Sequence, residues 1–346
     1  MRKVLLKVIS YVIAFVFLLL SLQIVFGATG FSDKILESVV NEQLRGTRQV
    51  LAQTIRDPDE LEKAVEAAKE DLDSLYGLDK PWYTRLPQST LRVITFDLGE
   101  ARTLRSFSGS NAVSDIVLER LPNTLIMMLP SFFLVAVFGL SIGVWAATHV
   151  GGRIDRLLSF FAVSSNAIPA WWISMLAIVV FGVVLNILPT GGMYSAPPPV
   201  GDISRFLDLA KHAILPIMSL TLVSIGPYMY AIRAMTIRTA QQPFVAYARA
   251  RGFSESRIRW RYILLPAAPP ISTSLVLGLV GSFSGAILTE TIFNWQGMGR
   301  LYYDALSGTP DEGLVVALTV IYALMFMVSR FVLDVLYIRL DPRVRR

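Results

Sequence analysis

The chain has 346 residues, of which 53% are hydrophobic and only 17% are charged. Soluble globular proteins contain about 45–50% apolar and about 25% charged residues. The sequence has no cysteine and only two histidines, which excludes disulfides, cysteine nucleophiles and histidine-rich metal sites. The formal net charge of +6 is unevenly distributed, since residues 28–120 carry 12 Lys and Arg against 16 Asp and Glu. The excess of basic residues therefore lies elsewhere in the chain, and it does not indicate nucleic acid as a partner.

Long runs without any charged residue divide the chain. A helix needs about 20 apolar residues to cross the hydrocarbon core of a bilayer. The pattern therefore predicts an all-α integral membrane protein with six transmembrane helices, and it excludes a purely soluble enzyme. The runs cover residues 8–32, 121–152, 157–201, 212–232, 262–289 and 313–329.

The first apolar run predicts a transmembrane helix within residues 1–27, with its N-terminus in the cytoplasm. It is longer than the ~7–15 apolar residues of a signal peptide, although cleavage near Ala28 is an alternative. Residues 28–120 then form a polar extracytoplasmic insert. Two amphipathic helices are expected there, over 33–55 and from Asp57 to Gly77, because Asp57 and Pro58 suit a helix start and glycine a helix end. This pair forms either a small packed cap or a docking surface for a soluble partner.

Residues 121–338 supply five further spans, with a basic loop at 233–265. The third apolar stretch is long for one span and contains Pro169. We expect one crossing, broken near this proline, because that arrangement keeps the basic loop in the cytoplasm. Between residues 233 and 261 this loop carries seven arginines against Glu255 alone, which is the positive-inside pattern. The tail, 339–346, carries four arginines, so both chain ends are expected in the cytoplasm.

The basic loop contains the most informative local pattern. Residues 243–253 predict a short helix that begins at Pro243 and stops at Gly252, where a left-handed turn is easily adopted. Phe244 and Tyr247 are able to fill a pocket, and Arg249 and Arg251 to pair with carboxylates. These features suit force transfer to a partner protein. The alternative is that the arginines anchor anionic lipid headgroups.

A Walker A phosphate loop and the HExxH zinc-binding motif are missing from the sequence. The phosphate loop requires a glycine directly before a lysine, and no glycine precedes any lysine. An ion-coupled secondary transporter, the alternative function, would show inverted repeats and midplane carboxylates, and neither is visible. Glu290 ends an apolar run, so it either lines a path through the membrane or caps the loop before Asn294 at the outer interface.

The pattern Ala-Tyr-Ala-x3-Gly…Ile-x-Leu-Pro at 246–266 resembles the EAA loop of ABC importer permeases, with Ala246 at the usual glutamate position. The chain as a whole resembles the oligopeptide/dipeptide/nickel permease family, in its first-permease branch. Further family-like blocks are 120–124 (RLPNT), 168–172 (IPAWW), 188–192 (LPTGG), 290–301 (ETIFNWQGMGRL) and 340–345 (LDPRVR).

This resemblance implies a type I ABC importer permease core preceded by an extra N-terminal span. It implies a transport subunit without enzymatic activity, whose ATP and Mg²⁺ lie on two separate ATP-binding subunits. The other implied partners are a second homologous permease and an extracytoplasmic substrate-binding protein, and the substrate is a short peptide or an oligosaccharide. The implied coupling residues are Phe244, Ala246, Tyr247, Ala248, Arg249, Arg251 and Gly252. Glu290, Asn294 and Trp295 are candidates for the translocation path or an outer gate.

Overall fold

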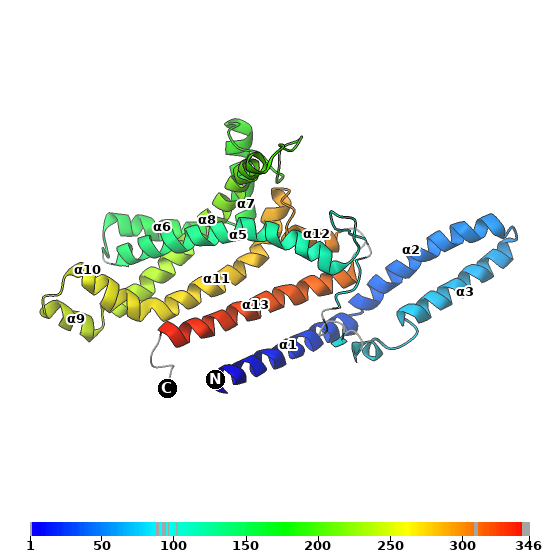
Figure 1. Ribbon diagram of the computed structural model, residues 1–346, viewed down its shortest axis with the longest axis horizontal. Coiled ribbons are helices and arrows are strands. Elements are labelled where there is room, and N and C mark those ends of the chain that lie inside the picture. Colours follow the sequence, from blue (N-terminus) through cyan, green and yellow to red (C-terminus); the bar gives the residue numbers. More distant parts are fainter. Residues whose placement is uncertain are drawn as a thin grey trace. The chain divides into compact units, whose positions relative to one another are not determined.

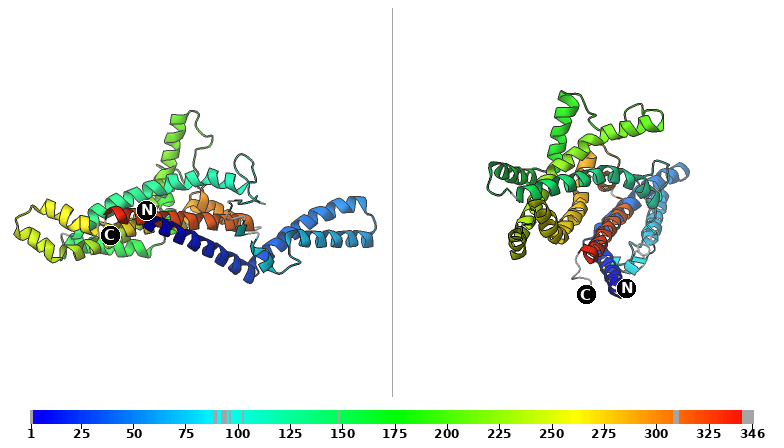
Figure 2. Two further views of the ribbon diagram at one scale, coloured as in Figure 1. Left: turned by 60° about the horizontal axis from the view of Figure 1, so that its bottom comes forward. Right: turned by 60° about the vertical axis from the view of Figure 1, so that its left-hand side comes forward.

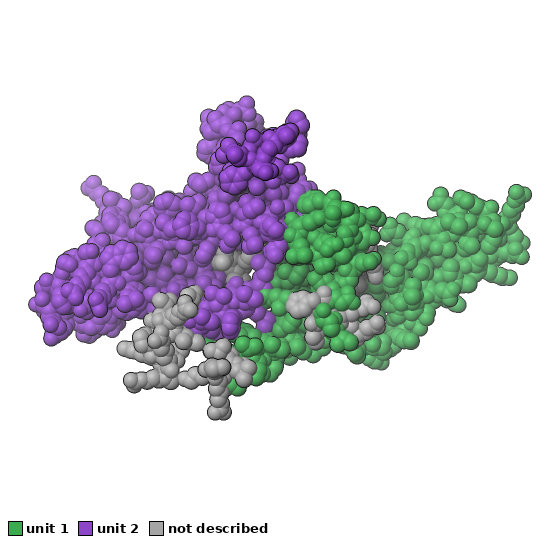
Figure 3. Space-filling model, in the orientation of Figure 1, with its two compact units in different colours: residues 1–119, 304–324 green, residues 120–303, 325–346 purple. Residues whose placement is uncertain are grey.

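The computed structural model describes residues 2–87, 90–91, 95, 97–101, 103–147, 149–307 and 311–340. Within these residues every regular element is helical, apart from a single β-bridge between Glu100 and Ala112. The chain folds into two compact units (Figure 3). Unit 1 comprises Met1–Glu119 and Asp304–Leu324, and unit 2 comprises Arg120–Tyr303 and Met325–Arg346.

Unit 1 begins with a long helix and a helical hairpin (Figure 1). These are α1 (Arg2–Ala28), α2 (Phe31–Thr54) and α3 (Pro58–Tyr76), followed by a short 3₁₀ helix, η1 (Trp82–Thr84). The ends of α3 follow from its sequence: the Asp57 side chain accepts a hydrogen bond from the Asp59 N–H, and Gly77 ends the helix at φ 68°. Both amphipathic helices expected in the insert are therefore present, while the insert's boundaries of 28–120 and its side of the membrane stay predictions.

The core of unit 1 pairs two elements that are far apart in the sequence. Leu19 of α1 is buried against Val320 of α13 (Glu312–Leu340). At the start of α13, the Asp311 carboxylate accepts hydrogen bonds from the Leu314 N–H at 3.2 Å and from the Thr103 N–H at 3.1 Å. Asp311 thus caps α13 and ties it to the loop that precedes α5.

Unit 2 holds most of α5 (Val113–Ala147), and α8 (Asp202–Ala240) packs along α6 (Arg153–Ala167), α7 (Ala170–Ala177) and α11 (Leu265–Ile292). The shorter elements are the π-helical turns η2 (Ile178–Val184) and η3 (Ile258–Leu264), together with α9 (Pro243–Ala250), α10 (Glu255–Arg257) and α12 (Met298–Leu306). One core cluster joins Val144 of α5, Ile232 of α8, and Ala267 and Ile271 of α11.

Four described helical segments are long and apolar enough to cross a membrane, namely Leu6–Ala28, Val113–Ala147, Asp202–Ala240 and Gly313–Val335. A bent pair, Arg153–Ala167 and Ala170–Val184, adds a fifth candidate. α11 has 28 residues and no charge before Glu290, a length of about 42 Å. The four segments and the bent pair correspond to five of the six spans expected from the sequence, and α11 lies where the remaining one is expected.

The third span is broken at the expected place. α6 and α7 meet at an angle of 97° on either side of Ile168 and Pro169, and Figure 2 shows α7 turning away from α6. Proline disfavours the α conformation in the residue before it, and Ile168 is extended at φ −95° and ψ 124°.

The fourth span differs from its prediction, because α8 runs beyond 232 to Ala240. No glycine or proline interrupts residues 233–240, and the helix ends just before Pro243. The first part of the expected loop, including Arg233 and Arg238, is therefore helical. The C-terminal block at 340–345 and the tail at 339–346 fall almost wholly outside the described residues.

Candidate functional site

The short helix expected in the basic loop is α9. Pro243 occupies its first turn, where a missing N–H costs nothing, and Gln242 before it is extended. After Ala250 the chain turns back at Gly252, whose φ is +76°. This left-handed conformation is readily adopted by glycine, which explains why the helix stops there.

The inner face of α9 packs within its own chain. Val245 and Ala248 are buried, 0% and 1% exposed, against Ile258 and Ile263 of η3. Phe253 also packs against this cluster. The structure thus places Ala248, one of the predicted coupling residues, in the core of the loop and not on its surface.

The outer face of α9 is aromatic and basic. Phe244 and Tyr247 are 43% and 66% exposed, and Ala246, Arg249 and Arg251 are exposed beside them. The Arg251 guanidinium lies over the Tyr247 ring at 5.9 Å from its centroid. Cation–π contacts of this kind hold an exposed arginine in place without neutralising it. The remaining predicted residues of the loop therefore form one exposed surface, Phe244, Ala246, Tyr247, Arg249, Arg251 and Gly252, which we call the α9 surface.

The loop after α9 is stabilised by Arg249 and by residues that the sequence does not single out. Arg249 Nε contacts Glu255 Oε1 at 3.1 Å, and both side chains are exposed. Arg257 stacks on Phe253 at 4.6 Å, and Ser254 caps α10 by accepting the Arg257 N–H. These contacts connect α9 to η3, which continues directly into α11.

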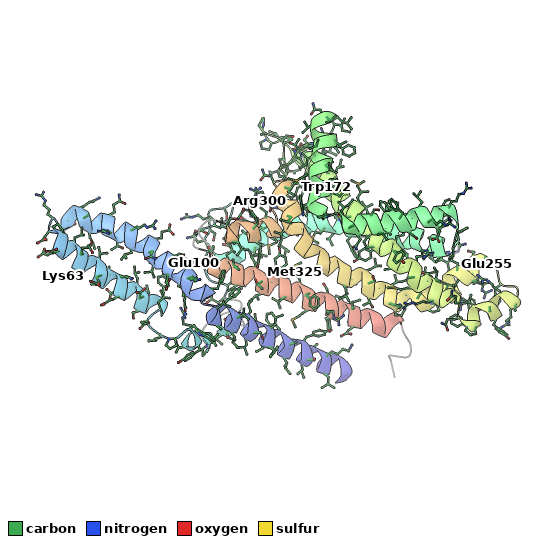
Figure 4. The ribbon with its side chains drawn as sticks, turned by 180° about the vertical axis from the view of Figure 1, so that it is seen from behind. Lys63, Glu100, Trp172, Glu255, Arg300 and Met325 are labelled. Atoms are coloured by element: carbon green, nitrogen blue, oxygen red, sulfur yellow. The ribbon has the colours of Figure 1, made fainter. Side chains whose placement is uncertain are left out.

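Glu290 lies in a buried polar cluster at the other end of α11; Figure 4 shows Glu255 and Arg300 at opposite ends of this helix. The Glu290 side chain is 0% exposed. Its Oε1 accepts the Thr124 hydroxyl at 2.7 Å, and its Oε2 accepts the Arg300 N–H at 2.9 Å. Since Arg300 is in the first turn of α12, Glu290 caps this helix and joins it to α5.

The turn between α11 and α12 is tied to α5 by further hydrogen bonds. Trp295 is 0% exposed, and its Nε1 donates to the Asn123 carbonyl at 2.8 Å. Asn123 Nδ2 in turn donates to the Gln296 carbonyl at 2.7 Å. Asn294 has φ +52° and is exposed, unlike Glu290 and Trp295, the other two candidates for the translocation path or an outer gate. Residues 290–300, with Asn123 and Thr124, form what we call the outer anchor, after the side of the membrane predicted for them from the sequence.

A small cavity lies between α5 and α8, and the sequence offered no pattern that would locate it. It has a volume of about 20 Å³, which is room for one water molecule. Met128, Ser131, Val135, Leu220, Ser224 and Tyr228 are among its lining residues. A peptide does not fit this space. Among the described residues, no three His, Cys, Asp or Glu side chains come together as metal ligands.

Comparisons with known proteins agree with this architecture. An inward-facing structure of the MetNI methionine ABC transporter superposes with a TM-score of 0.53 at 15% identity, covering 65% of this chain and 96% of that one. At this identity the likeness concerns the fold alone.

Curated relatives match most of the chain. The oligopeptide transport system permease protein AppB of Bacillus subtilis is 29% identical, covering 82% of this chain and 86% of AppB. The di/tripeptide permease protein DppB of Pseudomonas aeruginosa is 29% identical, with coverages of 78% and 82%. The glutathione permease protein GsiC of Escherichia coli is also 29% identical, with coverages of 85% and 88%.

The family described as binding-protein-dependent transport system inner membrane component matches residues 139–346, which is more than half of the chain. The matched segment contains both the α9 surface and residues 290–300 of the outer anchor. With its membrane-spanning helices and its type I importer fold, the chain belongs to this family of multi-pass permease subunits of ATP-driven importers.

Proposed function

We propose that the substrates of this permease are short peptides. The names of the relatives support this class, since they describe oligopeptide, di/tripeptide and glutathione transport, and each relative aligns over more than four fifths of its length. Oligosaccharides are the second class that the sequence suggested. No relative named here transports a sugar, so peptides are the better supported class.

The α9 surface is the proposed contact with an ATP-binding subunit. The observation that carries this proposal is the division of α9 into a face packed on η3 and an exposed face with Phe244 and Tyr247. An aromatic pair with flanking arginines suits a groove that has an apolar floor and acidic edges. ATP and Mg²⁺ would be held by that partner, because this chain has no Gly-Lys phosphate loop. The chain itself would catalyse no reaction.

The complete transporter would contain a second homologous permease, two ATP-binding subunits and an extracytoplasmic substrate-binding protein. The cytoplasmic location of both chain termini belongs to this proposal, and it is supported by the arginines between 233 and 261. At the outer side, Glu290 and Trp295 would hold the rim of the path in place. The exposed Asn294 would be the residue of this group that faces the path.

Uptake by the reconstituted complex tests the proposal. The tagged chain is purified with its partners from native membranes and placed in liposomes with the substrate-binding protein and labelled di- to pentapeptides. We expect peptide accumulation that requires ATP on the side of the ATP-binding subunits. Competition by unlabelled peptides, and not by oligosaccharides, would support the substrate class. Uptake driven by a proton or sodium gradient without ATP-binding proteins would replace this proposal with the secondary-transporter alternative.

A further inference from the structure

One buried ion pair in unit 2 has no place in the function described so far. Asp155 lies in the first turn of α6, and Arg233 lies in α8. Arg233 Nε donates to Asp155 Oδ1 at 2.7 Å, and Nη2 donates to Oδ2 at 2.8 Å. The two side chains are 17% and 7% exposed, with Asp155 the more buried. Two parallel hydrogen bonds fix the orientation of the guanidinium relative to the carboxylate as well as the distance between them, whereas a single hydrogen bond does not fix the orientation.

The Asp155 carboxylate is also held by the backbone next to its own helix. Asp155 Oδ2 accepts the Gly151 N–H at 2.9 Å, so the turn before α6 holds the acid in place. Arg233 therefore pairs within its own chain, although the sequence grouped it with the arginines of the basic loop. Buried ion pairs are poor sources of stability, since their desolvation offsets their attraction. A role in fixing the register of two helices accounts for the pair better than stability does.

A second contact joins the same two helices farther along. A Cβ atom at Gly226 of α8 would lie 2.9 Å from the Ala162 Cα and 2.0 Å from the Ser165 Oγ. The helix backbones are thus in direct contact at a position that admits only glycine. From Asp155 to Ala162, and from Arg233 back to Gly226, each helix advances seven residues, or about 10 Å. Two contacts at this separation prevent α6 from sliding or rolling against α8.

The joined helices lead to different parts of the molecule. α8 continues to α9 through a turn in which the Gln241 N–H donates to the Ile237 carbonyl at 3.1 Å. At its other end, α6 stops at the extended Ile168, where the chain bends by 97° into α7. A displacement of α9 would therefore reach α6 through α8, and the break at Ile168 and Pro169 is where the following segment can pivot.

From this arrangement, we propose that Asp155 and Arg233 are positioning residues that make α6 follow α8 when an ATP-binding subunit moves α9. The proposal rests on the coupling role proposed for α9. In the transporter, the pair then determines how many peptides are imported for each ATP hydrolysed. A merely structural pair would change the amount of folded transporter but not this ratio.

The first test measures peptide import per ATP hydrolysed in the reconstituted complex. We expect Asp155→Asn and Arg233→Gln to lower this ratio by about tenfold, within the usual range of coupling between sites. Exchanging the charges, Asp155→Arg with Arg233→Asp, should recover part of the loss. The matched control is Arg48→Gln, which breaks the exposed Arg48–Glu62 pair on α2 and α3 and should leave the ratio unchanged. An unchanged ratio in both single variants would overturn the proposal.

The second test follows distances, which the cysteine-free chain makes simple. Spin labels at Leu157→Cys on α6 and Ala246→Cys on α9 should give one narrow distance distribution with and without ATP. Asp155→Asn should broaden this distribution or make it depend on nucleotide. A distribution that Asp155→Asn leaves narrow and constant would contradict the proposal. Tyr247→Ala serves as the reference for the coupling role of α9. If this variant leaves peptide import per ATP unchanged, the assignment of α9 fails. If it lowers peptide import per ATP while Asp155→Asn leaves that ratio and the distance distribution normal, only the role of the ion pair is rejected.

Discussion

The outer anchor makes a specific prediction about Gly297. A Cβ atom built at this position would lie 2.5 Å from Cδ and from both carboxylate oxygens of Glu290. Ordinary contacts of this kind are about 3.4 Å or longer, so Gly297→Ala forces the carboxylate to move. It cannot move freely, because the Thr124 hydroxyl and the Arg300 N–H hold it at 2.7 and 2.9 Å.

The expected cost follows from these contacts. Overpacking a buried site costs about 1–3 kcal/mol, and a buried donor that loses its acceptor costs about 1–3 kcal/mol. If the shift breaks one of the two hydrogen bonds, Gly297→Ala destabilises unit 2 by about 2–6 kcal/mol. In the Glu290→Ala background the obstructing carboxylate is gone, so the same substitution should cost little. The two changes are therefore expected to be strongly non-additive.

Thermal unfolding of the detergent-solubilised complex, followed by tryptophan fluorescence, measures these effects for both single variants and the double variant. Gly46→Ala is the matched control, because Gly46 lies in α2 with nothing within 4 Å of an added Cβ. Alanine there should stabilise the helix by up to about 1 kcal/mol. Equal destabilisation by Gly297→Ala with and without the Glu290 side chain would mean that the carboxylate is not the group that the added methyl displaces.

Three further predictions concern the helix ends and the α9 surface. Asp57→Ala removes the cap of α3 and should destabilise this helix by about 1 kcal/mol, visible as faster amide hydrogen exchange in residues 59–62; unchanged exchange would contradict the capping role. Gly252→Val should lower import per ATP because valine resists the observed φ of +76°, whereas Gly252→Asn should be tolerated; equal activity of both would mean that the turn is not required. Tyr247→Ala should lower coupling without changing the unfolding temperature. Val245→Ala should lower that temperature at a cost of about 1–3 kcal/mol; the reverse pattern would exchange the two faces of α9.

Much of the helical architecture could be predicted from local sequence, because local rules decide it. Asp57 and Gly77 bound α3 as their side-chain and backbone preferences require. Charge-free runs located the long helices, and Pro169 marked the break in the third span. The 97° angle at that break could not be predicted, since it depends on how α7 packs against α8 and α11.

The functional residues were harder to assign, because their environment is tertiary. The sequence pattern grouped Ala248 with its exposed neighbours, but packing on η3 buries it. Glu290 had two open interpretations, and the structure shows its carboxylate at the first turn of α12. Asp155 and Arg233 are 78 residues apart, and only the antiparallel packing of α6 and α8 brings them together. A lone acid just before the third apolar run was the available signal for this pair.

Site-specific cross-linking from α9 identifies the protein that the α9 surface contacts. Because the natural chain has no cysteine, Ala246→Cys places a single thiol on the α9 surface, and Leu75→Cys places one on the exposed side of α3 as a control. Each variant is treated in native membranes with a short thiol-to-amine cross-linker, and the products are identified by mass spectrometry. We expect an ATP-binding subunit cross-linked to residue 246 and not to residue 75. Cross-links from 246 to lipid or to no protein, in a complex that still imports peptides with ATP, would contradict it.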